Sequence, residues 1–130
     1  MRTLLICTLL FFTLSAPAFA LDPGPFDLTV YANEDYVLNL THKANGQPIN
    51  LTGYQYKLQA KKSAGSAAFV TFSSAITNAA AGQTRHWLSK ATTRGNANSA
   101  GSYDLMQTAP DGTITYRLKG NIKIVETVTR

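Results

Sequence analysis

Two histidines, His42 and His86, are the side chains of this sequence best suited to proton transfer near neutral pH. A hydrolase needs such a base beside a nucleophile and an oxyanion-stabilising group, and a metal site needs ligands at a spacing such as His-x-x-x-His. Neither histidine belongs to a pattern of that kind. We therefore predict that both are partly exposed strand histidines, and a small hydrolase using His42, His86 and Asp104 is only a third alternative.

The seven carboxylates are the other candidates, because a glycosidase needs only two of them. Glu34 and Asp35 are adjacent, so they lie on opposite faces of a strand or in a turn. Asp104 is expected to face solvent or a loop, Asp111 belongs to a turn, and Glu126 lies on the last strand. No pair forms a recognisable motif. We predict no enzyme activity, no catalytic residue, no metal ligand and no cofactor.

Aromatic side chains remain as candidates for binding. Trp87 follows His86 and lies two residues after Arg85. Tryptophan and arginine contribute disproportionately to binding energy at interfaces, so Arg85 and Trp87 are the candidate partner-contact residues. The alternative is that Trp87 is a core residue.

Strands must position these side chains, because the apolar residues repeat with a period of two rather than 3.6. Alternation of this kind predicts antiparallel strands with one buried and one solvated face. It is clearest from Gly53 to Lys61, and it recurs from Asp35 to Thr41 and from Thr113 to Lys119. The residues expected to point inward are Tyr54, Tyr56, Leu58 and Ala60, then Tyr36, Leu38 and Leu40, and Ile114, Tyr116 and Leu118.

About eight strands are expected in all. Asn45-Gly46 predicts a turn with positive φ, Pro110-Asp111-Gly112 predicts a hairpin, and residues 89–101 form a crossing loop with one helical turn. Short strands at this spacing, without a long helix, favour an all-β fold: an immunoglobulin-like antiparallel β-sandwich rather than a small barrel. The further strands are predicted at Phe26–Tyr31, Ala68–Phe72, Gln83–Leu88, Ser102–Thr108 and Asn121–Val128.

The first twenty residues have the pattern of a cleavable signal peptide. Arg2 precedes an apolar run over 4–14, and small residues follow up to Ala20. The run is about half the roughly 20 residues that a membrane-spanning helix needs. We expect residues 1–20 to be the signal peptide, 21–25 a lead-in and 26–130 the β-sandwich domain, exported to the periplasm, the cell surface or the medium, without a stable membrane span after cleavage.

Composition narrows the classes of partner. The only cysteine, Cys7, lies within the predicted signal peptide, so the exported domain is expected to have no disulfide. The chain has 12 Lys and Arg against 7 Asp and Glu, and loss of Arg2 lowers the formal net charge from +5 to +4. The basic residues are scattered, which is typical of a solvated surface, and a nucleic-acid role is not expected. A weak attraction to an acidic surface glycan is compatible with this charge.

Several short motifs in a fixed order give a resemblance to a known family. They are Asn-Gly-Gln-Pro-Ile-Asn-Leu-Thr-Gly-Tyr at 45–54, Gly-Ser-Tyr-Asp-Leu at 101–105, Asp111-Gly112, Leu-Lys-Gly at 118–120 and Val128-Thr129. In this order the motifs resemble the immunoglobulin-like β-sandwich domains of tailed-bacteriophage and prophage virion proteins. The resemblance covers about residues 33–130.

The resemblance implies a non-enzymatic structural or adhesive module of a tail, baseplate, fibre or related particle. Its partner would be a protein of the virion or envelope, and a homo-oligomer is compatible with it. The matched residues are expected to serve the fold, so no binding site is transferred. The alternative is an exported periplasmic or secreted immunoglobulin-like domain that binds a glycan or a protein. Both an exported location and a virion location stay open.

Overall fold

The structure is a computed structural model that describes residues 24–129. The predicted signal peptide and residues 21–23 of the predicted lead-in lie outside the described residues. The last two residues of that lead-in form the short strand β1 (Gly24–Pro25).

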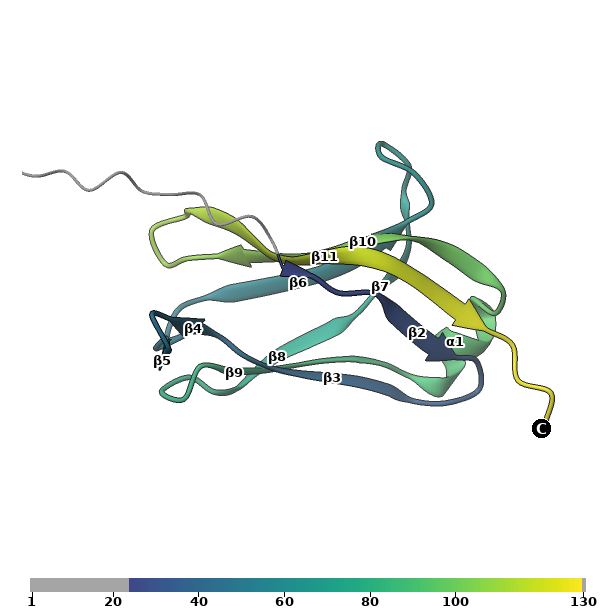
Figure 1. Cartoon of the computed structure of the whole chain (residues 1–130), viewed down its shortest axis with the longest axis horizontal. Helices are drawn as coiled ribbons and strands as arrows, with labels where there is room; N and C mark the ends of the chain where they lie inside the picture. Colours follow the sequence, from purple (N-terminus) through teal and green to yellow (C-terminus); the bar gives the residue numbers. More distant parts are fainter. Residues whose placement is uncertain (1–23, 130) are drawn as a thin grey trace, which may run out of the picture.

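The described chain is mostly β, in two main sheets that face each other (Figure 1). The larger sheet has the order β1-β11-β10-β6-β7, with β2 also paired to β11, and the smaller has the order β3-β9-β8. All pairs are antiparallel except those of β1 and β2 with β11. The strands of the larger sheet are β2 (Leu28–Tyr31), β6 (Gln55–Lys61), β7 (Ala68–Thr71), β10 (Ser99–Thr108) and β11 (Ile114–Val125). Those of the smaller sheet are β3 (Tyr36–Thr41), β8 (Ser73–Asn78) and β9 (Gln83–Leu88).

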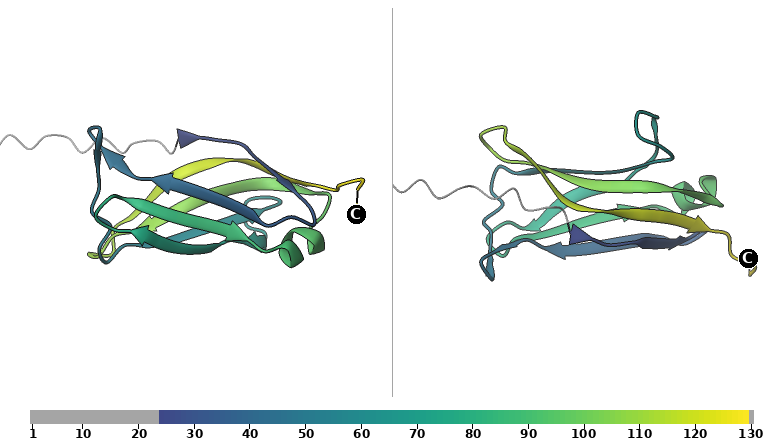
Figure 2. Two further views of the ribbon diagram at one scale, coloured as in Figure 1. Left: turned by 90° about the horizontal axis from the view of Figure 1, so that it is seen from below. Right: turned by 45° about the horizontal axis from the view of Figure 1, so that its top comes forward.

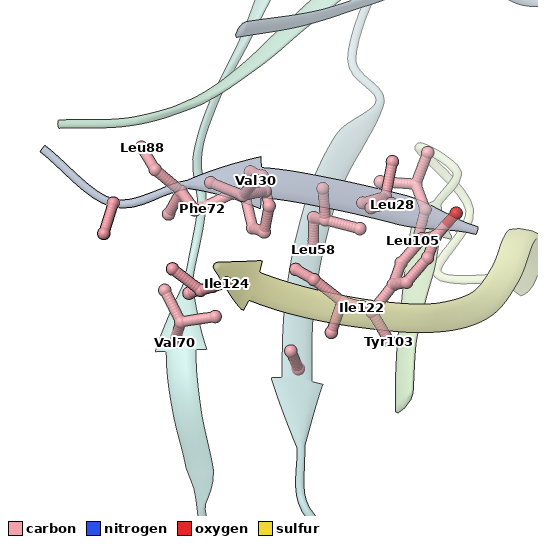
Figure 3. Close-up of a cluster of buried hydrophobic side chains, with 12 residues drawn as sticks. Leu28, Val30, Leu58, Val70, Phe72, Leu88, Tyr103, Leu105, Ile122 and Ile124 are labelled. Atoms are coloured by element: carbon pink, nitrogen blue, oxygen red, sulfur yellow. The ribbon is translucent and has the colours of Figure 1, made fainter. Parts of the chain in front are cut away.

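Side chains from both sheets meet in one core, which Figure 3 shows. Alternate residues of each strand point inward, as the period of two requires. The hydroxyl of buried Tyr103 also donates a hydrogen bond to the backbone carbonyl of Phe26, which ties β10 to the segment between β1 and β2. The buried apolar residues of this cluster are Leu28, Val30, Ala32, Leu58, Ala60, Val70, Phe72, Leu88, Tyr103, Leu105, Ile122 and Ile124.

Most predicted strands are confirmed, and Gln83–Leu88 has the bounds expected. Besides the two-residue strands β1, β4 and β5, the strand β8 was not predicted, because its residues are small and polar and only Ser74 and Ile76 turn partly inward. The two strands predicted on either side of Gly120 are wrong as separate elements, since β11 runs through this position. A Cβ at Gly120 would lie 2.2 Å from the carbonyl oxygen of Phe26, so this glycine permits a close approach of two backbones and does not end a strand.

A β-bulge in the β10–β11 hairpin overturns part of the predicted inward set. Leu105 pairs with Leu118, but Met106 pairs with Tyr116, so Arg117 is an extra residue on β11. The extra residue reverses which side chains face the core. Leu118 packs against the core as predicted, whereas Ile114 and Tyr116 are 55% and 46% exposed, so the prediction that they point inward is wrong.

The connections follow the predicted turn signals. Asn45 and Gly46 have φ of 50° and 77° and join the short strands β4 (Lys43–Ala44) and β5 (Gln47–Pro48). Pro110-Asp111-Gly112 makes the turn between β10 and β11, closed by a 2.8 Å hydrogen bond from Ala109 N to the carbonyl oxygen of Thr113. The predicted helical turn is α1 (Lys90–Gly95), capped by the Ser89 side chain, although β10 already begins at Ser99. Two further views in Figure 2 show α1 at one end of the sheets.

Candidate functional site

Both histidines are buried, so the prediction that they are partly exposed is wrong. His86 is 0% exposed and His42 is 6% exposed. On β9 the inward residues are Thr84, His86 and Leu88, and this alternation directs Arg85 and Trp87 to the outer face. His42 directly follows β3 and points inward like Leu40, which lies two positions earlier.

A chain of hydrogen bonds runs through these buried groups within the smaller sheet. Ser74 Oγ on β8 lies 2.7 Å from His86 Nδ1, and His86 Nε2 lies 3.0 Å from Thr84 Oγ1. The same Thr84 oxygen lies 2.9 Å from His42 Nε2. The hydroxyl of Thr84 can donate a hydrogen bond to one imidazole and accept one from the other. All the contacts in the chain can therefore be hydrogen bonds, whichever of the two imidazoles is the acceptor.

Tyr56 of the larger sheet packs against this chain from the opposite side. Its ring centroid lies 4.7 Å from that of His42 and 6.1 Å from that of His86. Its hydroxyl donates a 2.9 Å hydrogen bond to Gln107 Oε1 on β10. The histidine cluster, by which we mean Ser74, Thr84, His86, His42, Tyr56 and Gln107, therefore bridges the two sheets.

Burial sets the protonation state of the cluster. Removal from water, and then the positive charge of Arg117, together lower the pKa of His42 to about 4. Burial and then the neighbouring His42 lower the pKa of His86 to about 4. Burial raises the pKa of Tyr56 to about 12. All three groups are neutral near pH 7, which suits a hydrogen-bonded interior.

The residues of the third alternative, a small hydrolase, do not come together. His42 and His86 share Thr84, but Asp104 is exposed on β10, whose neighbours Tyr103 and Leu105 are the buried residues. Asp104 faces solvent, as predicted. Residues 24–129 contain no group of three His, Cys, Asp or Glu side chains arranged to hold a metal ion.

The other carboxylates serve turns and strand ends. Glu34 and Asp35 lie in the connection between β2 and β3, and Asp35 Oδ1 accepts a 2.6 Å hydrogen bond from the backbone N–H of Lys90 at the start of α1. Asp111 Oδ1 accepts a 2.9 Å hydrogen bond from the N–H of Thr113, and this bond lowers the pKa of Asp111. Glu126 Oε2 accepts a 2.9 Å bond from the Asn98 side chain.

Arg85 and Trp87, the predicted contact residues, lie together on the outer face of the smaller sheet. The Arg85 guanidinium carbon is 5.7 Å from the centroid of the Trp87 ring, which is the geometry of a cation–π pair. Trp87 is half-buried and does not belong to the core, so its interpretation as a core residue is wrong.

The neighbours of this pair come from both flanking strands. Trp87 is opposite Val37 on β3 and Ser73 on β8, and Arg85 is opposite Asn39 and Ala75. We call these six residues the Trp87 face. Val37 is 40% exposed and adds apolar surface beside the indole ring. Sequence reasoning missed the other four members because strand register is a long-range property.

The whole sequence was compared with known protein families and with curated proteins. No protein-family model and no curated protein sequence matches it. Among residues 24–129 there is no helix long and apolar enough to cross a membrane. The Trp87 face and the histidine cluster are the two features of the described residues that bear on function.

Proposed function

We propose that this protein is a non-enzymatic, immunoglobulin-like β-sandwich that binds a protein partner through its Trp87 face. The strand order supports the fold assignment. The sheet β3-β9-β8 faces β2-β11-β10-β6-β7, and the chain passes from one sheet to the other between β7 and β8. This order parallels the B-E-D and C-F-G strand sets of immunoglobulin-like domains.

The observation that carries the binding role is the position of Trp87. A tryptophan on the solvated face of a sheet exposes apolar surface to water, which is unfavourable. Here Arg85 and Val37 extend that surface. Tryptophan and arginine are the residues most enriched at binding hot spots. No carboxylate belongs to the Trp87 face, so a partner with an acidic or neutral surface fits it best.

The arrangement of the histidine cluster supports a role without catalysis. The side chain of Ser74 bonds to a histidine whose other nitrogen is already occupied by Thr84. That histidine is 0% exposed, so a substrate carbonyl has no direct approach to it. A cluster whose groups satisfy one another stabilises and specifies a core.

The partner we propose is a component of a virion or of the cell envelope, met after export. The motif order from residue 45 to residue 129 supports the virion version, and the leader pattern of residues 1–20 supports the export version. Mass spectrometry of purified particles separates the two. Absence of the chain from intact particles would overturn the virion version, and an unprocessed N-terminus in a cytoplasmic fraction would overturn export.

Site-specific cross-linking tests the binding face. A photoreactive amino acid at position 39 of the full chain, opposite Arg85, should give a discrete adduct with one partner when the protein is produced in its own host. The matched control at position 119 lies on an exposed residue of the other sheet and should give none. Trp87→Ala should weaken the adduct while the circular dichroism spectrum is unchanged. If Trp87→Ala unfolds the domain, or both positions cross-link alike, the proposal fails.

A further inference from the structure

We infer that the outer surface of the larger sheet holds a second binding site, which takes an acidic polysaccharide. This site lies on the opposite sheet from the Trp87 face, so it stands or falls independently of the proposed function. It is centred on Tyr116, the aromatic residue that the β-bulge at Arg117 turns out of the core.

A cavity of about 480 Å³ provides the space for a ligand. That volume lies within the roughly 300–1,000 Å³ of small-molecule sites. The outward residues of β6 and β10 form its floor, and the loop between β6 and β7, with Ser63 to Gly65, forms a wall. Figure 2 shows this loop projecting beyond the sheet. The side chains that matter for the ligand are Lys57, Lys61, Asp104, Met106 and Tyr116.

The bulge explains why an aromatic ring is available here. Without the extra residue, the alternation along β11 would point Tyr116 inward, toward the core. With it, Tyr116 is 46% exposed and lies in a cross-strand row with Met106 and Lys57. Bulges often re-aim a side chain next to a functional site. An exposed tyrosine ring offers a flat apolar face on which the C–H face of a sugar can stack.

A second cavity continues the site around the edge of the sheets. It has a volume of about 330 Å³, and Tyr116 lines it together with Lys43 and Arg117. Tyr116 therefore belongs to both cavities. Two adjoining cavities that share one aromatic residue suit a chain-like ligand better than a single small molecule.

The charges select an acidic ligand. Lys57 and Lys61 line the first cavity, and Lys43 and Arg117 line the second, whereas Asp104 is the only carboxylate that lines either one among the described residues. Lysine and arginine side chains attract carboxylate or sulfate groups on a polymer, most strongly at low ionic strength.

The carboxylate of Asp104 favours a polysaccharide over a nucleic acid. Lys57 and Lys61 are four residues apart on one strand, or about 13 Å, and Asp104 pairs with Gln59 between them. The phosphodiester backbone of a DNA strand has no hydroxyl that could donate a hydrogen bond to this carboxylate. A sugar polymer can instead present a hydroxyl that donates a hydrogen bond to this carboxylate.

Binding of the whole chain to polygalacturonate and alginate, with dextran as the neutral polymer, tests the inference. Affinity electrophoresis at low salt should show retardation by the acidic polymers and none by dextran. Tyr116→Ala leaves the net charge unchanged and should weaken binding at least tenfold. Lys57→Gln with Lys61→Gln should do the same.

The matched control is Lys90→Gln with Lys123→Gln, which removes the same charge from exposed residues outside both cavities. It should change affinity less than threefold, and Trp87→Ala should not change it. The inference is overturned if neither acidic polymer binds, or if the control pair weakens binding as much as the site pair, which indicates a general charge effect. It is also overturned if Tyr116→Ala has no effect, or if a single-stranded oligonucleotide binds more tightly than both polysaccharides.

Discussion

The two faces of strand β9 differ in a way that reverses the usual rule of apolar inside and polar outside. Its inner face carries Thr84 and His86, two polar groups that are almost completely buried. Its outer face carries Trp87, the one tryptophan in the sequence, beside a charged arginine. The buried polar groups on the inner face are tolerated because each is hydrogen-bonded within the protein. The indole on the outer face needs no hydrogen-bond partner within the protein.

The difference teaches which face is committed to the fold. Removing any member of a buried hydrogen-bonded cluster leaves its partners with neither water nor protein to bond. A substitution on the inner face therefore lowers the free energy of unfolding substantially. The outer face loses only packing within one layer when it changes. An apolar residue that is unfavourable in water and is not needed for folding is a candidate for binding a partner.

Acid should break the inner face most strongly. The pKa of His42 and of His86 is about 4 in the folded protein, against about 6.5 in the unfolded chain, so the unfolded chain binds more protons. Stability contributed by the neutral histidines is complete above about pH 6.5 and is lost as the pH falls toward 4, by up to about 3 kcal/mol per histidine. Urea unfolding at a series of pH values measures this loss.

Two measurements check that the histidines cause the acid effect. In NMR titrations of the intact chain, the imidazole signals of both residues should stay in the neutral form at pH 5.5. The double variant His42→Gln, His86→Gln should have a flatter profile of stability between pH 6.5 and 4. Imidazole signals that titrate near 6.5 would contradict the prediction even if the double variant fails to fold.

Thr84→Val should break the same cluster at neutral pH. Valine has nearly the shape of threonine, but it removes the one oxygen that both imidazole Nε2 atoms contact. We expect a loss of about 2 kcal/mol in the free energy of unfolding, since two buried nitrogens lose a partner. Thr41→Val is the matched control, because Thr41 is exposed on β3 and should change stability by less than about 0.5 kcal/mol. Equal effects at the two threonines would refute the distinction.

Trp87→Ala should have a smaller effect on folding, although tryptophan is the larger side chain. We expect a loss of about 1 kcal/mol, because the indole is half-buried on one side of a sheet. Leu88→Ala, one residue along and 2% exposed, should cost about 3 kcal/mol because it opens a cavity in the core. Thermal or urea unfolding of the two variants measures the contrast. A greater loss for Trp87→Ala than for Leu88→Ala would show that the outer face belongs to the folding core.

The sequence was sufficient for most of the strands and for both sharp turns, because alternation and turn chemistry are local. It was not sufficient for Ile114 and Tyr116, since the bulge at Arg117 depends on how β11 pairs with β10. The break expected at Gly120 failed for a related reason: the glycine accommodates the backbone before β2, about ninety residues earlier in the chain.

The candidate site was predictable only in part. Arg85 and Trp87 could be chosen from their residue types, and the structure brings them into contact. The histidines were assigned to the wrong environment because a polar residue inside a strand indicates the solvated face unless its partners are known. Those partners, Ser74, Thr84 and Tyr56, come from three different strands, and local sequence does not reveal that they meet.

Arg85→Gln makes the finest distinction between folding and binding on the outer face. The exposed cation–π pair with Trp87 is worth about 0.5 kcal/mol, so the midpoint of urea unfolding should hardly move. Cross-linking to the partner, measured from a photoreactive residue at position 39 on the neighbouring strand, should nevertheless fall severalfold, because the guanidinium supplies charge and hydrogen bonds that glutamine lacks. Arg85→Lys keeps the charge but not the planar guanidinium group. A cross-linking yield between those of the unaltered chain and Arg85→Gln would show that the planar group contributes to the contact in addition to the charge. If Arg85→Gln lowers stability and leaves the cross-link unchanged, then the arginine serves the sheet, and the outer face differs from the inner one only in degree.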